Sequence, residues 1–212
     1  MVVGASGGVG RWAATLAANE GHSVTAVMRP SSEFDPVDGA RVVRGDLTDP
    51  GFLENVVEGH DAVLSCVGLR RAGKSPFAKL LSPPDLMTRL ASALTRAMEG
   101  RYVRRLVLIS AGGVADSFAK LTWPVQQLVS TGNVAVAYRD LAGMEARLSA
   151  SSLDWLAVRP VTLMNGAPTG RARPVSRYGL ASIVRRSDVA QWMVRAATQH
   201  DSFVEHTVLL GS

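Results

Sequence analysis

Short apolar runs alternate along the chain with longer stretches in which apolar residues recur every three or four positions. The runs predicted as strands are Met1–Val3, His22–Met28, Arg41–Arg44, Asp61–Val67, Arg105–Ser110, Leu153–Val158 and Phe203–Leu210. The stretches predicted as helices are Gly8–Glu20, Pro50–Glu58, Pro83–Glu99, Ala119–Val129, Asn133–Ala150 and Ser187–Thr198. Repeated strand–helix alternation is typical of an α/β protein built around a parallel sheet.

The pattern predicts one doubly wound domain over residues 1–212, with a mostly parallel sheet covered by helices on both faces. Residues 69–82, 111–131 and 160–175 lack a clear period and are predicted as substrate loops. Pro124 is expected to interrupt its helix, because proline lacks the N–H that a helix interior uses. Ser187 is expected to cap the last helix.

A glycine-rich turn joins the first predicted strand to the first predicted helix. Its sequence is Gly4-Ala5-Ser6-Gly7-Gly8-Val9-Gly10, with glycines at G-x-x-G-x-x-G spacing. Such glycines permit a tight turn, close approach to a pyrophosphate and tight packing of the helix on the strand. In this strand–turn–helix setting the motif predicts dinucleotide binding, and the alternative is a structural turn without a ligand.

The tip of the second predicted strand carries Arg29, where a site that prefers NAD(H) usually carries an acidic residue. A guanidinium can hold a 2′-phosphate through charge-assisted hydrogen bonds, so we expect NADP(H) rather than NAD(H). Arg29 as an ordinary solvated arginine is the alternative. Asp46, which precedes Leu47 after the third strand, is expected either to reach the adenine or to cap the helix at Pro50.

Composition narrows the functional classes. The net charge is +5 and the arginines are scattered, whereas nucleic-acid binding usually needs a concentrated basic face, so no nucleic-acid partner is expected. No apolar stretch is long enough to span a bilayer, and no signal peptide is expected. The single cysteine, Cys66, is expected to be a buried core residue, which is compatible with the cytoplasm. The four histidines fit no metal motif.

Several segments resemble one family in both order and spacing. They are VGASGGVGR, GHSVTAVMRP, GDLTDP, DAVLSCVG, LVLISAGG, MEARLSASSLDWLAVRPVTL and SDVAQWMV. Together they resemble an atypical short-chain dehydrogenase/reductase, similar to the biliverdin/flavin reductases and the NmrA-like proteins. The resemblance spans nearly the whole chain and is more specific for the fold than for the activity.

The resemblance implies a set of cofactor contacts. Gly4, Ser6, Gly7, Gly8, Val9 and Gly10 would hold the pyrophosphate, Arg29 the 2′-phosphate, and Asp46 with Leu47 the adenine side. Val67 and Gly68 would line the ribose, Ser110 would lie beside the nicotinamide, and Pro160 and Val161 would form the far wall.

The chain departs from the family in its catalytic residues. Classical members use Tyr-x-x-x-Lys, in which the lysine lowers the pKa of the tyrosine. Four residues after Tyr102, Tyr138 and Tyr178 come Leu106, Ala142 and Ser182, so the pair is absent.

Ser110 and Tyr138 remain the candidate catalytic residues. Ser110 is expected to donate a hydrogen bond near the nicotinamide, or else to bond the backbone at the strand end. Tyr138 falls where the family's catalytic tyrosine would fall, and its alternative is packing on its helix. Glu145 is expected to pair with Arg159 or Arg147 rather than to act in catalysis.

The sequence therefore predicts an NADPH-dependent reductase of a small carbonyl, flavin or quinone-like acceptor. The substrate is expected to be an apolar or anionic small molecule, and the protein a monomer or homodimer. The alternatives are a non-catalytic NADP(H)-binding redox sensor, and a cofactor-dependent isomerase or tailoring enzyme.

Overall fold

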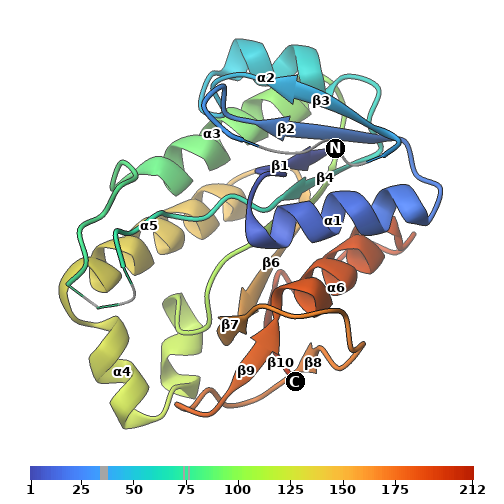
Figure 1. The fold of residues 1–212 in the computed structure, drawn as a ribbon. Coiled ribbons are helices and arrows are strands. Elements are labelled where there is room, and N and C mark those ends of the chain that lie inside the picture. The colour runs from blue at the N-terminus through green and yellow to red at the C-terminus, as the bar shows by residue number, and fades with distance from the viewer. Residues whose placement is uncertain (34–37, 74, 76) are drawn as a thin grey trace.

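Eight strands form one sheet in the computed structural model, which describes residues 1–33, 38–73, 75 and 77–212. They are β1 (Val2–Val3), β2 (Val24–Met28), β3 (Ala40–Arg44), β4 (Ala62–Ser65), β5 (Arg105–Ile109), β6 (Asp154–Pro160), β8 (Arg173–Pro174) and β10 (Thr207–Gly211). Their order is β3-β2-β1-β4-β5-β6-β10-β8 (Figure 1). All neighbouring pairs are parallel except β10 with β8. The predicted α/β architecture with a mostly parallel sheet is confirmed.

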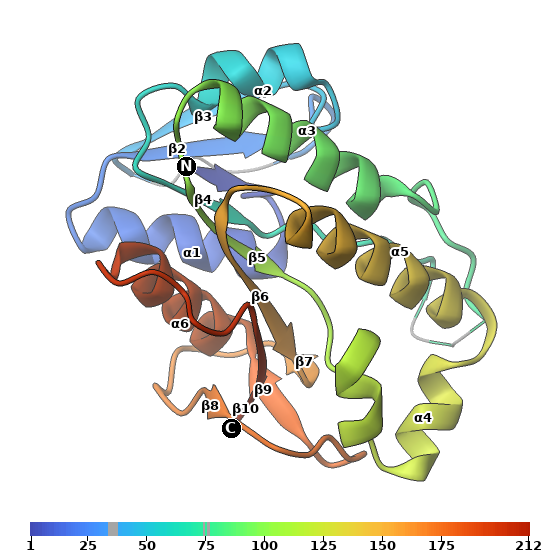
Figure 2. The same ribbon diagram turned by 180° about the vertical axis from the view of Figure 1, so that it is seen from behind.

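Helices cover both faces of the sheet. They are α1 (Gly8–Asn19), α2 (Pro50–Val57), α3 (Leu86–Gly100), α4 (Trp123–Val129), α5 (Gly132–Ser149) and α6 (Arg186–Thr198), with a 3₁₀ helix, η1 (Ala115–Lys120). Figure 1 shows α1 and α6 side by side on one face, and Figure 2 shows α2, α3 and α5 on the other. Two apolar clusters result, one on each side of the sheet. None of these helices is long and apolar enough to cross a membrane, within the described ranges.

Three local predictions are corrected by the structure. Pro124 lies in the first turn of α4, where no helical N–H is needed, so it begins the helix instead of interrupting one. Ser187 lies inside α6 and its hydroxyl donates to the carbonyl of Gly166, while Arg185 occupies the cap position. The segment predicted as irregular contains β8 and also β7 (Thr162–Met164), which pairs with β9 (Ile183–Arg185) in a small second sheet. These strands are too short to show a period.

The direction of the strand order reverses at β1. From β1 the chain proceeds to β2 and β3 on one side of the sheet, and then returns to β4 and β5 on the other. In open parallel sheets such a reversal leaves a crevice at the carboxyl ends of the strands, where the connecting segments diverge. The turn after Val3 lies at the carboxyl end of β1, where this reversal occurs.

A carboxylate from α5 caps α3. The side chain of Asp140 is buried and accepts hydrogen bonds from the backbone N–H groups of Met87 and Thr88, at 2.8 and 3.0 Å, and from the Thr88 hydroxyl at 2.8 Å. Asp85, at the cap position of α3 itself, makes no side-chain capping bond. The two long helices on this face are therefore held together by a cap that only the tertiary structure supplies.

We expect Asp140→Ala to lower the free energy of unfolding by about 2 kcal/mol, because it leaves two helical N–H groups without an acceptor. Asp85→Ala, the matched control, should cost less than about 0.5 kcal/mol. Urea unfolding monitored by circular dichroism measures both values. Equal losses for the two variants would contradict the role given to Asp140.

Candidate functional site

The turn between β1 and α1 is held by backbone hydrogen bonds, one within the turn and one to β2. Gly4 has a φ of +77°, donates to Val27 O at 2.8 Å, and accepts from the N–H of Gly7 at 2.9 Å. A Cβ on Gly10 would overlap the carbonyl oxygen of Gly4, and one on Gly4 would lie 2.8 Å from Val67 Cγ2. A residue with a side chain therefore cannot replace Gly4 or Gly10 without moving the backbone.

The amino end of α1 points into the crevice with no built-in acceptor. Gly7 occupies the cap position and has no side chain, and the first turn contains no acidic residue. The first N–H groups of a helix lack intrahelical partners and lie at the positive end of the helix dipole. This arrangement favours an anion such as a phosphate.

A cavity of about 160 Å³ lies beside this turn, at the carboxyl ends of β1, β2 and β4. Eight of the residues that the sequence predicts as cofactor contacts line it: Gly4, Ser6, Gly7, Arg29, Asp46, Leu47, Val67 and Gly68. Its other walls come from Met28, Thr48, Cys66, Arg70, Ser82, Leu86 and Leu90. The cavity therefore joins the glycine turn to the tip of β2, as an adenosine site would require.

Cationic and hydroxyl groups lie around this cavity. Arg29 follows β2, and Arg70, which follows β4, lines the same cavity. The Ser6 hydroxyl donates to the Ser32 hydroxyl at 3.2 Å, which ties the glycine turn to the segment after β2. Sequence reasoning missed Arg70, because it lies in a loop without a period. Its position just beyond a buried strand was the available signal.

Asp46 is held in a local turn. Its Oδ1 accepts from the backbone N–H and the hydroxyl of Thr48, both at 2.8 Å, and these bonds lower the pKa of the Asp46 carboxyl. The cap of α2 is Asp49, whose Oδ1 accepts from Gly51 N at 3.0 Å. The capping alternative for Asp46 is therefore wrong, and Asp46 is an ionised group at the edge of the cavity.

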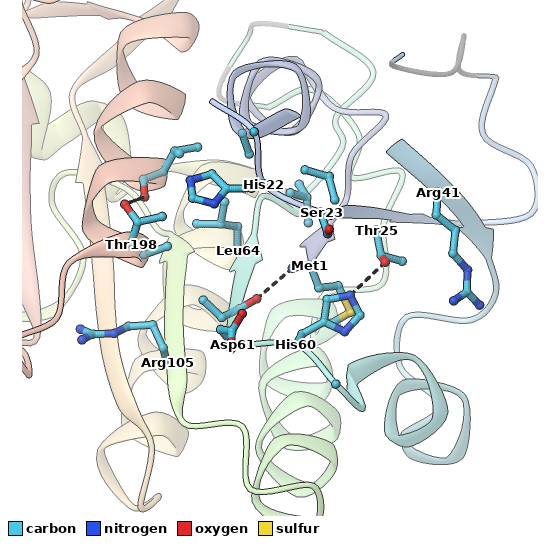
Figure 3. Close-up of a pocket in the computed structure, with 18 of the residues that line it drawn as sticks. Met1, His22, Ser23, Thr25, Arg41, His60, Asp61, Leu64, Arg105 and Thr198 are labelled. Atoms are coloured by element: carbon cyan, nitrogen blue, oxygen red, sulfur yellow. Dashed lines mark hydrogen bonds between the residues drawn. The ribbon is translucent and has the colours of Figure 1, made fainter. Parts of the chain in front are cut away.

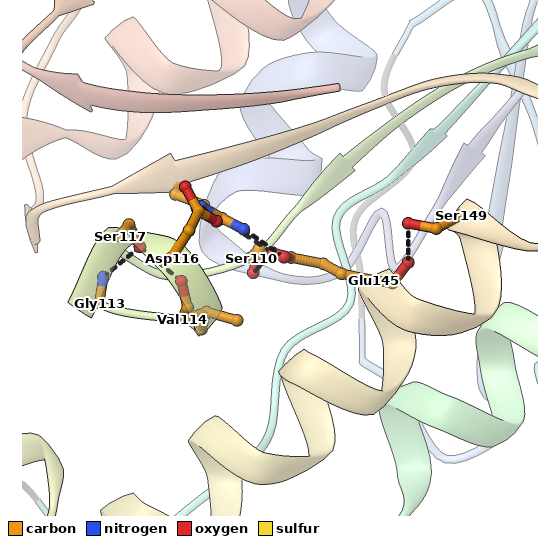
Figure 4. A network of polar contacts seen from close by, with 8 residues as sticks. Ser110, Gly113, Val114, Asp116, Ser117, Glu145 and Ser149 are labelled. Atoms are coloured by element: carbon orange, nitrogen blue, oxygen red, sulfur yellow. Dashed lines mark hydrogen bonds and ion pairs between the residues drawn. The ribbon is translucent and has the colours of Figure 1, made fainter. Parts of the chain in front are cut away.

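Ser110, directly after β5, belongs to a buried ionic network (Figure 4). Its hydroxyl donates to Glu145 Oε1 at 2.6 Å, and Arg159 donates from Nε to the same oxygen at 3.0 Å. The Arg159 guanidinium also pairs with Glu145 Oε2 and, at 2.8 Å, with Asp116. The prediction that Glu145 pairs with Arg159 is confirmed. Because a serine hydroxyl has one proton, Ser110 offers a ligand its lone pairs and not a donor.

The pKa values of two groups in this region, Asp116 and Tyr138, are shifted by their surroundings. Burial acts to raise the pKa of Asp116, but the hydrogen bond and charge of Arg159 outweigh it, so that the pKa is lowered. Burial, with a smaller contribution from Tyr178, raises the pKa of Tyr138. The Tyr138 hydroxyl donates to the carbonyl of Gly112 at 3.0 Å. Tyr138 therefore stays protonated, with its proton directed at the backbone.

The remaining predicted contacts lie outside the 160 Å³ cavity. Val9 and Gly10 are buried beneath the turn, and Gly8 lies exposed at its surface. Pro160 ends β6 and Val161 follows it, and both lie near Ser110, since Ser110 N donates to Val158 O at 2.7 Å and Gly112 N to Pro160 O at 2.9 Å. Cys66 lines the cavity but is buried, and burial raises its thiol pKa to about 12.

A larger cavity, of about 890 Å³, lies at the opposite edge of the sheet (Figure 3). Met1, Thr25, His60 and Arg105 are among its lining residues, at or near the amino ends of the strands. This cavity lies beyond the amino end of β1. Because β1 is short, β2 and β4 each extend two residues farther than Val2 toward this end of the sheet. In folds of this class ligands bind at the carboxyl ends, so the smaller cavity is the candidate site.

Comparison with known proteins places the chain among nucleotide-binding proteins. A family model described as NAD(P)H-binding matches residues 4–200. The chain is also similar to an isoflavone reductase homologue of Zea mays, with 32% identity over 78 residues. That match covers 32% of this chain, and the chain spans only a quarter (25%) of the maize protein.

Solved structures share the fold over nearly the full length. ChuY, an anaerobillin reductase from Escherichia coli O157:H7, is 24% identical with a TM-score of 0.73, over 99% of this chain and 94% of that one. A short-chain dehydrogenase/reductase of Veillonella parvula, solved with NADP, is 16% identical with a TM-score of 0.75, over 100% and 93%. A candidate exported protein of Burkholderia pseudomallei is 26% identical with a TM-score of 0.71, over 100% and 98%.

We expect Gly10→Ala to weaken dinucleotide binding at least about 10-fold and to destabilise the fold by about 1–3 kcal/mol, because the added methyl group meets Gly4 O. Gly100→Ala, where a Cβ meets nothing within 4 Å, is the control and should leave binding unchanged. Calorimetric titration with NADPH and thermal unfolding measure the two effects. Unchanged binding by a folded Gly10→Ala protein would refute the importance of this contact.

Proposed function

Because the chain belongs to an NAD(P)H-binding family, we propose that it is an NADPH-dependent oxidoreductase that reduces a small carbonyl, flavin or quinone-like acceptor. The observation that carries the proposal is the glycine turn at the strand reversal, whose helix end is free of acidic side chains and adjoins a cavity lined by Arg29 and Arg70. When bound, the cofactor would supply the hydride. The residues of this chain would bind it, orient the acceptor and exclude water.

The preference for NADP(H) rests on the charges around the cavity. Arg29, Arg70 and Ser6 line it, and the Ser32 hydroxyl accepts a hydrogen bond from Ser6. A guanidinium gains most from a phosphate with two or more charged oxygens, whereas a ribose 2′-hydroxyl is best held by a carboxylate. These groups support a 2′-phosphate site in which Arg29 is the principal ligand.

The state of the two candidate catalytic hydroxyls favours an acceptor that needs little proton transfer. Tyr138 has a raised pKa and donates to Gly112 O, and the position of the family lysine holds Ala142. We therefore assign Tyr138 to packing and to positioning the Gly112–Gly113 segment. Flavins and quinones stabilise their own reduced charge, so a weak local acid is less of an obstacle for them than for a simple carbonyl.

Ser110 would orient a bound group by accepting a hydrogen bond from it. Its proton is directed at Glu145, so the complementary group is an N–H or O–H of the cofactor carboxamide or of the acceptor. This role replaces the donor role expected from the sequence. Glu145 and Arg159 would act as positioning residues, because they fix the direction of the Ser110 hydroxyl.

The second candidate function is a non-catalytic NADP(H)-binding sensor. The protons of Ser110 and Tyr138 are both directed at acceptors within the protein, and this observation favours a sensor. Binding without turnover is its distinguishing property. We also propose a cytoplasmic location, which the single buried cysteine supports.

We expect Arg29→Ala to weaken NADPH binding roughly 10- to 100-fold, matching the loss of about 1.4–2.8 kcal/mol of charge-assisted bonding, and to leave NADH binding nearly unchanged. Arg41→Ala removes an exposed arginine from the other edge of the sheet and is the charge-matched control. The measurement is the dissociation constant of NADPH and of NADH for the wild type and for both variants. An equal loss for NADPH and NADH would show that Arg29 does not read the 2′-phosphate.

The reductase proposal predicts NADPH oxidation at 340 nm in the presence of at least one flavin or quinone, at a rate that exceeds that with simple aldehydes and ketones. A panel of free flavins, quinones, conjugated enones and simple carbonyls, each with and without protein, tests this prediction. Tight NADPH binding with no oxidation across the panel would instead favour the sensor.

A further inference from the structure

The first residue of α6 reaches across to the glycine turn. A Cβ added to Gly8 would lie 2.7 Å from Cδ of Arg186 and 3.1 Å from its Nε. The side chain of Arg186 thus occupies the space that any larger residue at position 8 would need. Gly8 has a negative φ and lies at the surface, so the turn itself does not need a glycine there, whereas the observed position of the Arg186 side chain does.

Arg186 has only neutral partners among the residues that the structure describes. Its Nη1 donates to Asn165 Oδ1 at 2.8 Å and makes a longer contact, 3.5 Å, with Leu163 O. None of the ion pairs between described residues includes Arg186, in contrast to the buried Arg159, which pairs with two carboxylates. The guanidinium therefore has no carboxylate partner among the described residues.

Two positive features meet at this place. The amino end of α1 has no acidic residue in its first turn, and the cationic side chain of Arg186 lies against Gly8, the first residue of that helix. Like charges held together without compensation are unfavourable, and an anion placed between them removes that cost. The arrangement is therefore complementary to a group that carries negative charge on several oxygens.

We propose that Arg186 binds the pyrophosphate of the dinucleotide, opposite the N–H groups of α1, and that Asn165 sets the direction of its guanidinium. The inference rests on the proposed cofactor and adds a ligand from the far end of the chain. It also places the pyrophosphate next to the segment after β6. Neighbouring residues at the start of α6 hold that segment, because Ser187 donates to Gly166 O and Asp188 accepts from the N–H of Gly170, both at 2.8 Å.

The test compares Arg186→Met with Arg185→Met. Methionine keeps most of the apolar stem, and Arg185 is an exposed neighbour whose Nη1 donates to Ala167 O and whose side chain lies against Gly166 instead of Gly8. Dissociation constants are measured by calorimetry for NADPH, for NADH and for adenosine 2′-monophosphate, which lacks the pyrophosphate. Thermal unfolding confirms that each variant folds.

We expect Arg186→Met to weaken the binding of NADPH and of NADH by the same factor, about 10-fold or more, and to leave the binding of adenosine 2′-monophosphate unchanged. Arg185→Met should change none of the three, and Arg186→Lys should recover part of the loss. The inference about Arg186 would be overturned, and the proposed function left standing, by either of two results. One is that Arg186→Met binds the dinucleotides with the same dissociation constants as the wild type, and the other is that it loses affinity for adenosine 2′-monophosphate by the same factor. Failure of the wild-type protein to bind either dinucleotide would overturn the proposed function instead.

Discussion

In the turn between β1 and α1, the backbone of Gly10 packs against the carbonyl of Gly4 so closely that no side chain fits between them. This contact fixes where α1 begins and keeps its first N–H groups directed at the crevice. The crevice exists because the chain leaves β1 toward β2 and returns to β4 on the other side. The start of α1 and the reversal of the strand order therefore lie at the same place. The 160 Å³ cavity and the side chain of Arg186 both lie next to it.

A second constraint organises the other half of the crevice. Glu145 from α5, Arg159 from β6 and Asp116 from the 3₁₀ segment form one network, in which the side chains of Glu145 and Arg159 are 7% and 3% exposed. Buried charges are tolerated only when their hydrogen bonds are satisfied, so α5 and β6 must stay together, and the exposed Asp116 adds a further contact from η1. The network also fixes the Ser110 hydroxyl as a donor to Glu145. Ser110, which its residue type suggests as a hydrogen-bond donor to the ligand, can therefore only accept a hydrogen bond from it.

The parallel sheet was predictable because its central strands are buried on both faces and read as continuous apolar runs. The helices were predictable because each buries one face, which leaves a helical period in the sequence. The glycine turn and Arg29 were predictable because their chemistry is local. Arg186 was not, since its approach to Gly8 joins the two ends of the chain. The capping of α3 by Asp140 was hidden for the same reason, because the cap position of that helix already holds Asp85. The strand β7 was missed because three residues show no period.

The central claim is that the amino end of α1 holds the cofactor phosphates. Amide chemical shifts of the ¹⁵N-labelled protein, recorded during titration with NADPH, test it most directly. The account predicts that the largest shifts fall on Gly7, Gly8, Val9 and Gly10, with smaller ones beside Arg29. Largest shifts at Gly21, Gly39 and Gly59, which line the 890 Å³ cavity at the opposite edge of the sheet, would contradict it.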